Sequence, residues 1–157
     1  MALKQAKQIV EKLPTISASG YEPIVIVGDY TTVAGLAVND VIEMAILPAG
    51  YVPLSAKLVC EDIDSGATPT LTLDVGIVSG TAGVADNSRT CGSEAVAASV
   101  VGQAGGVAVD DKAAFSLLAV SDSDRGVGVK LAAAAATLIT GAKIRLTVMA
   151  RPALNGG

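Results

Sequence analysis

The sequence contains no histidine and no tryptophan, and aromatic residues make up 3% of its 157 residues. Histidine is the commonest metal ligand and the side chain most used for acid–base chemistry near neutral pH. Its absence excludes Ser-His-Asp triads, histidine-ligated zinc and histidine-assisted cysteine nucleophiles. Because Phe115 is the single phenylalanine, the core must consist mainly of valine, isoleucine, leucine and alanine. The scarcity of aromatic anchors predicts that any tight binding comes from a wide surface or from many copies.

Clusters of positive charge and long apolar runs are also missing. The formal net charge is −4 and the isoelectric point is about 4.7, which argues against binding to a phosphate backbone. Mean hydropathy is +0.56, yet no stretch reaches the roughly 18 consecutive apolar residues of a membrane-spanning helix. Residues 1–13 carry three lysines and lack the apolar core of a signal peptide. We therefore expect neither a nucleic-acid partner nor a membrane partner.

The sequence has two cysteines, Cys60 and Cys91. Their number and spacing fit either a disulfide or two buried thiols. Because no export signal is recognised, the pair is interpreted as free thiols. Cys60 lies on the apolar side of a predicted strand, so it is interpreted as a core residue and not as a nucleophile.

Residues 1–20 are predicted to form a separate N-terminal helix or arm. Leu3, Ala6, Val10 and Leu13 share one side of a helix over residues 2–13, and Pro14 ends it. A helix this short is marginal in water. It must therefore pack on its own domain, on another subunit or on a partner. The candidate contact residues for the capsid or a second subunit are Leu3, Lys4, Lys7, Val10 and Leu13.

From residue 21 onward the apolar period changes from helical spacing to two, which predicts strands with one buried face. Near-continuous apolar segments at 24–27 and 114–120 predict central strands that are buried on both sides or lie at a subunit contact. Residues 132–136 are interpreted as a connection, and residues 80–106 as a long surface excursion with one short strand near 94–101. The predicted fold for residues 21–157 is an all-β, antiparallel β-sandwich. The strands with alternating apolar residues are predicted at 41–46, 54–61, 70–77, 127–131 and 143–150.

Motifs for chemistry are incomplete throughout the chain. The glycines at 102–106 and 126–128 complete neither a dinucleotide fingerprint nor a P-loop. Glu61, Asp62 and Asp64 form the densest acidic cluster, but the twelve-residue calcium-loop pattern is missing. The cluster is interpreted as a solvated turn at a strand end. We expect no enzymatic activity, no catalytic residue, no cofactor and no metal.

As a whole, the pattern of strands and turns resembles the small decoration, or cement, proteins of tailed bacteriophages. The resemblance rests on an apolar strand that runs into a Pro-Ala-Gly turn at 38–53 and on the antiparallel pair 54–64 and 70–77. It also rests on residues 125–130 and a closing strand at 141–152. The resemblance implies a jelly-roll-like sandwich, made in the bacterial host cytoplasm, that binds the outer surface of the capsid. The implied partners are the major capsid protein and further copies of the chain, as a homo-dimer or homo-trimer.

Two other functions compete with this interpretation. One is another phage structural component, such as a tail, baseplate or head-fibre protein. The other is a carbohydrate-binding β-sandwich module, which would require a calcium site or an aromatic platform from Tyr21, Tyr30 and Tyr51. A β-sandwich serves many functions, so the fold alone does not separate these alternatives.

Overall fold

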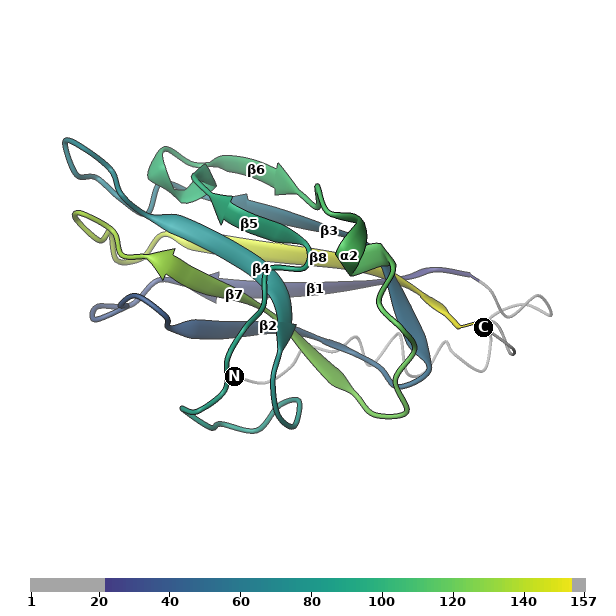
Figure 1. Cartoon of the computed structure of the whole chain (residues 1–157). Coiled ribbons are helices and arrows are strands. Elements are labelled where there is room, and N and C mark those ends of the chain that lie inside the picture. Colours follow the sequence, from purple (N-terminus) through teal and green to yellow (C-terminus); the bar gives the residue numbers. More distant parts are fainter. Residues whose placement is uncertain (1–21, 154–157) are drawn as a thin grey trace.

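The computed structural model describes residues 22–153, whose strands form two packed antiparallel sheets (Figure 1). The first sheet has the order β1 (Ile24–Thr31), β8 (Lys143–Pro152), β3 (Tyr51–Cys60) and β6 (Gly106–Val109). The second sheet has the order β2 (Val41–Leu47), β7 (Arg125–Ala133), β4 (Thr72–Val78) and β5 (Val96–Ser99). The 3-10 helix η2 (Val101–Gln103) and the helix α2 (Ala113–Ser116) lie in connections. The predicted all-β sandwich is confirmed, whereas the predicted helix at 2–13 lies outside the described residues.

The chain changes sheet at each connection between these strands except that between β4 and β5. Strands that are adjacent in a sheet are therefore distant in the sequence, except for β4 and β5. The core fills the space between the sheets and consists almost entirely of aliphatic side chains, as the composition predicts. Its fully buried members include Leu58, Leu73, Val75, Val127, Val129, Leu146 and Val148.

The period-two segments form strands as predicted, but local bulges change which side some residues face. In β3 the pairing with β8 shifts between Pro53 and Ser55. Leu54 is consequently exposed, although the alternation had placed it on the buried side with Leu58. A further shift in β2 follows Glu43. The short strand expected near 94–101 is also present, as β5.

Of the two near-continuous apolar segments, residues 24–27 form a strand as predicted but at a sheet edge and buried on one side only, which leaves the predicted subunit contact as the open alternative, whereas residues 114–120 differ from the prediction. In β1, Ile24 and Ile26 are buried, but Val25 and Val27 point outward and are exposed, because no described segment covers that side of the sheet. Residues 114–120 form no strand. Both edges of β3 are occupied by β8 and β6, and the chain instead makes the helical turn α2, which buries Phe115 and leaves Leu117 78% exposed.

One lateral edge of the sandwich is closed by a contact between the two sheets. Strand β1 approaches β2 so closely at Gly28 that a Cβ atom there would collide with the Met44 carbonyl group. Only glycine permits such an approach between two backbones. The contact fixes the spacing of the sheets along the edge from which the N-terminal segment enters the domain.

Candidate assembly surfaces

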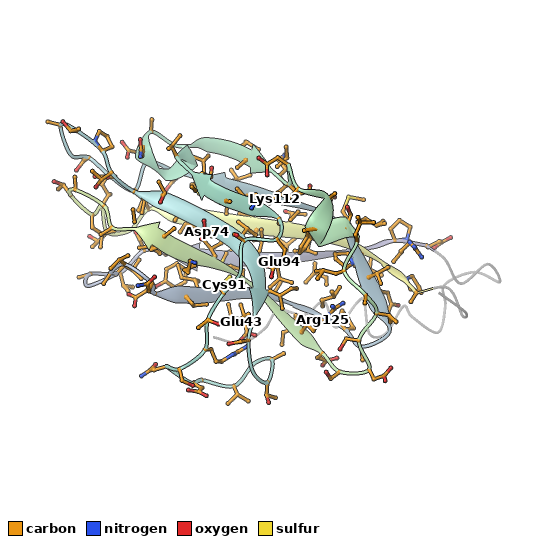
Figure 2. All side chains as sticks on the ribbon, viewed as in Figure 1. Glu43, Asp74, Cys91, Glu94, Lys112 and Arg125 are labelled. Carbon is orange, nitrogen blue, oxygen red and sulfur yellow. The ribbon has the colours of Figure 1, made fainter. Side chains whose placement is uncertain are left out.

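The outer face of the second sheet is covered by the chain itself. Residues 79–95, here called the strap, fold back across β4 and β7 (Figure 2). Beneath the strap the sheet presents Gly76, Gly126 and Gly128, and a Cβ atom at any of them would collide with neighbouring atoms. The Cys91 thiol lies 3.5–3.6 Å from the carbonyl oxygens of Gly76 and Gly128. The predicted surface excursion is therefore partly a cover that needs glycines in the sheet below it.

A buried ion pair anchors the strap to β2. Arg89 donates through Nη2 to Glu43 Oε1 at 2.7 Å and through Nη1 to Glu43 Oε2 at 2.9 Å. The Arg89 and Glu43 side chains are 6% and 17% exposed. Arg89 also donates to the carbonyl oxygens of Ser79 at 2.6 Å and Val84 at 2.8 Å. The hydrogen bonds with Glu43 raise the pKa of Arg89, so the guanidinium stays charged. Its hydrogen bonds hold residues 79, 84 and 89 of the strap together and join them to β2.

Further polar contacts close the rest of this face. The Glu94 carboxylate accepts a hydrogen bond from the Ile77 amide at 2.9 Å. Asp74 lies opposite Lys130 in the β4–β7 pairing and forms an ion pair with it at 2.9 Å. Asp74 also accepts a hydrogen bond from the Ala98 amide at 2.8 Å. A protein approaching the covered sheet would thus meet mostly polar groups that already form hydrogen bonds or ion pairs within the domain.

The outer face of the first sheet is different, because no described segment lies over it. We call it the open face, made of the outward side chains of β1, β8, β3 and β6. Six of its large apolar side chains are exposed, namely Val25 (48%), Val27 (42%), Leu54 (37%), Met149 (38%), Val107 (56%) and Val109 (59%). Apolar side chains gathered on one surface of a domain indicate a protein contact. The open face is the best candidate for a functional surface in residues 22–153.

Strand register shows how the open face is arranged. Val25 lies opposite Met149, and Val27 lies in one cross-strand row with Thr147, Lys57 and Val109. The next row contains Asp29 and Arg145, which form an ion pair at 2.6 Å with both side chains about 60% exposed. The exposed valines therefore lie on the two edge strands, while Met149 and Leu54 lie on the central strands β8 and β3 among small and charged polar groups. Two segments of the sequence indicate this face, namely Ile-Val-Ile-Val at 24–27 and Gly-Val-Ala-Val at 106–109. In both segments the residues on either side of the strand are apolar.

Both ends of the described chain leave from the same end of the sandwich. Ile24 pairs with Ala150, so residue 22 precedes and residue 153 follows two neighbouring strands, β1 and β8. At this end the Arg125 guanidinium donates to the Tyr51 carbonyl at 3.3 Å and to the Ala119 carbonyl at 2.9 Å. The predicted contact residues Leu3, Lys4, Lys7, Val10 and Leu13 lie outside the described residues.

The acidic cluster was predicted to be a solvated turn, which holds for the exposed residues Glu61 and Asp62 but not for Asp64. Asp64 is 1% exposed. One carboxylate oxygen accepts hydrogen bonds from the Gly66 and Thr137 amides, and the other accepts from Ala136 and the amides at 70–71. Burial by itself raises the pKa of Asp64, but the backbone donors outweigh burial and hold the pKa well below its usual range. The carboxylate thereby joins the β3–β4 and β7–β8 connections at the end opposite the termini.

The rest of the cluster is also used within the domain. Asp62 accepts a hydrogen bond from the Asp64 amide at 3.0 Å, and Glu61 accepts one from the Lys143 amide at 2.8 Å. Within residues 22–153 no group of three or more histidine, cysteine, aspartate or glutamate side chains is placed to hold a metal. Cys60 and Cys91 are buried free thiols, and burial raises the pKa of each to about 12.

A polar cavity of about 650 Å³ lies between the β1–β2 connection and the strap. Its lining includes Tyr30, Asp40, Glu43, Asn87 and Arg89. Tyr51 is only 7% exposed and offers no platform for a sugar ring, while Tyr21 lies outside the described residues. The cavity therefore has one aromatic side chain in the described part of the chain. No helix within residues 22–153 combines the length and the apolar character needed to cross a membrane.

Comparison with solved structures shows that the chain is similar to chains in phage capsids. It is 40% identical to a chain in the capsid of Ralstonia phage GP4, with a TM-score of 0.80 over 85% of this chain and 86% of that one. It is 27% identical to a chain in the capsid asymmetric unit of cyanophage Pam1, with a TM-score of 0.69 over 87% of this chain and 89% of that one. No protein-family model and no curated protein matches the sequence. The identity to the GP4 chain, sustained over most of both chains, shows that this chain belongs to a family of bacteriophage capsid proteins.

Proposed function

We propose that this chain is a decoration protein, which binds the outer surface of an assembled phage head and stabilises the head. Membership of a capsid-protein family agrees with the expected structural, non-enzymatic role in the virion. The observation that carries the finer proposal is the open face. A protein that attaches to a finished shell needs one docking side, whereas a subunit that builds the shell needs contacts around its whole circumference. In residues 22–153, six large exposed apolar side chains share one face, and the opposite sheet is covered by the strap.

The composition supports attachment through many copies. With few aromatic anchors, each copy has limited means to bind tightly, and avidity compensates when several linked copies bind together. We therefore propose the major capsid protein as one partner and further copies of this chain, in dimers or trimers, as the other. Residues 1–20 are the proposed arm, with Leu3, Lys4, Lys7, Val10 and Leu13 contacting the head or a neighbouring copy.

The test is co-sedimentation of the purified chain with expanded, undecorated heads from its source phage. Binding at a fixed copy ratio to the major capsid protein is expected, and the ratio identifies the symmetry positions that are filled. Leu117→Glu is the matched control, because Leu117 is exposed but belongs to α2's connection and not to the open face. Assembly of the chain alone into closed shells would instead assign it the shell-forming role. Failure to bind heads and to form shells would favour a tail, baseplate or fibre component.

Deletion of residues 1–14 separates the arm from the sandwich. The proposed role of the arm predicts a truncated protein that keeps its β-rich circular dichroism spectrum but no longer attaches to heads or no longer oligomerises. Full decoration by the truncated chain would show that the contact lies elsewhere.

A further inference from the structure

Strand β6 lies at an edge of the first sheet, and no described segment pairs with its outer side. Two of the other edge strands, β1 and β2, close against each other at Gly28. The fourth, β5, pairs with β4 at only two positions, with a register shift between them. β6 instead pairs with β3 in an unbroken register. Figure 1 shows β6 along the upper margin of the sandwich, with no described segment beyond it. A regular edge of this kind is a template for a further strand.

The hydrogen bonds between β3 and β6 determine which backbone groups of β6 remain unpaired. The Asp110 amide donates to the Ala56 carbonyl at 2.9 Å. In an antiparallel pair such bonds recur at every second residue, so the next residue of β6 that bonds to β3 is Ala108. The N–H and C=O groups of Val107 and Val109 therefore point away from β3, toward the outer side of the edge.

β6 also lacks the features that keep an exposed edge from pairing. Such edges usually carry a charged residue, a proline or a bulge, whereas β6 has the sequence Gly-Val-Ala-Val and no bulge. The side chains of Val107 and Val109 are themselves exposed on the open face. The edge thus presents unpaired backbone groups together with apolar side chains, the combination that strand addition uses.

We propose that the β6 edges of two copies pair antiparallel across a two-fold axis and join the two first sheets into one continuous sheet. The edge is complementary to itself when Ala108 lies opposite Ala108 of the second copy. Val107 then lies opposite Val109 of the second copy, and the two residues exchange both N–H···O=C bonds, because both direct these groups outward. The two-fold axis repeats this pair, so each copy contributes the same surface.

The charges beside β6 agree with a second copy as the occupant. In this register Asp110 lies opposite Gly106 of the second copy, which has no side chain to obstruct it. The two Asp110 residues are then four positions apart along the paired strands, or about 13 Å. That distance exceeds the screening length of about 8–10 Å at physiological salt. The edge therefore supplies both the pattern and its complement without bringing like charges together.

Pairing within one sheet also places the two open faces on the same side, because residues directly opposite each other point their side chains to one face. A dimer can then bring both open faces to the head, and binding of the first raises the effective concentration of the second. This consequence rests on the proposed function. The pairing itself concerns the chain in solution, so its test needs no heads.

The first test measures molar mass by sedimentation equilibrium over a range of concentrations. The unchanged chain should form dimers. Val109→Pro removes an N–H that points to the second copy and leaves the β3–β6 bonds in place, and proline is tolerated on an edge strand in this position. Because the two-fold axis removes the bond twice, the dissociation constant should rise about tenfold or more. Val27→Lys is the matched control, since it changes an exposed valine on the other edge strand and should leave the dissociation constant unchanged.

The second test uses paired charges to examine the register and keeps every backbone group. In Val107→Lys/Val109→Lys, lysines lie opposite lysines in the dimer, and like charges directly opposite each other are destabilising. This variant and Val107→Glu/Val109→Glu should each be monomeric by themselves. Mixing the two should restore dimers that contain one chain of each kind. Because both valines are exposed, the circular dichroism spectrum of each variant should match that of the unchanged chain.

Three results would overturn the inference: an unchanged chain that is monomeric or trimeric, a dimer that Val27→Lys and Val109→Pro weaken equally, or charged variants that do not combine. A monomeric chain whose binding to heads is lost in Val109→Pro would assign the edge to a strand of the major capsid protein instead. Dimers that do not bind heads would count against the proposed function and leave this inference standing.

Discussion

Breaking the Glu43–Arg89 ion pair tests whether the strap is an integral part of the fold. Arg89→Met removes the guanidinium and keeps most of the apolar stem. It leaves the Glu43 carboxylate, 17% exposed, without its cation. It also leaves the carbonyl oxygens of Ser79 and Val84 without a donor that reaches them at 2.6 and 2.8 Å. The change therefore removes four hydrogen bonds from one site.

The expected loss follows from the burial of the pair. Removing one partner of a buried ion pair costs about 3–5 kcal/mol, because the other charge stays buried and unpaired. Since Glu43 keeps some contact with water, we expect the lower end, about 3 kcal/mol, for Arg89→Met. Replacing both residues, as Glu43→Leu/Arg89→Met, removes the unpaired charge as well. The double variant should therefore be less destabilised than the sum of the single changes, as a double-mutant cycle measures.

Urea unfolding followed by far-ultraviolet circular dichroism is the suitable assay, because the chain has no tryptophan. The unfolding midpoint should fall while the dependence on urea concentration stays constant. Arg145→Met is the matched control. It removes a similar arginine–carboxylate pair, with Asp29, whose side chains are 60% and 62% exposed, and exposed pairs contribute little. The reasoning would be refuted if Arg89→Met and Arg145→Met lowered the midpoint equally, or if the effects at 43 and 89 were additive.

Three other predictions follow from buried groups. Asp64→Asn should lower the unfolding midpoint at pH 7 and flatten the loss of stability in acid, because the folded pKa of Asp64 lies below its unfolded value. Its contribution is therefore present above about pH 4 and is lost as the pH falls; an unchanged acid profile would contradict this. Phe115→Ala should cost about 3–5 kcal/mol by chemical denaturation, since Phe115 is fully buried, whereas Leu117→Ala should be nearly neutral. Cys60 and Cys91 should resist thiol reagents in the folded protein and react after unfolding, because burial raises the pKa of each to about 12. Rapid labelling of the folded protein at neutral pH would contradict this, because it would show that the two thiols are accessible to solvent.

The sequence by itself determined the class of fold. Apolar residues at every second position bury one face of a strand, and this local property does not depend on which strands pair. The pattern therefore predicted the strands containing Leu58, Val129 and Leu146. The absence of histidine excluded catalytic and zinc sites that depend on it. The resemblance to phage decoration proteins led to the right virion family, while the decoration role itself stays a proposal.

Tertiary structure decided what covers each sheet. Asp64 reads as a solvated turn residue, but its five donors come from segments 2 to 73 positions away, and only folding brings them together. Arg89 meets Glu43 across 46 positions, a spacing that no local pattern marks. Val25 and Val27 belong to a strand whose local sequence is apolar on both sides. Whether that second side is buried depends on packing against other segments, and the strap covers the other sheet and leaves this one open.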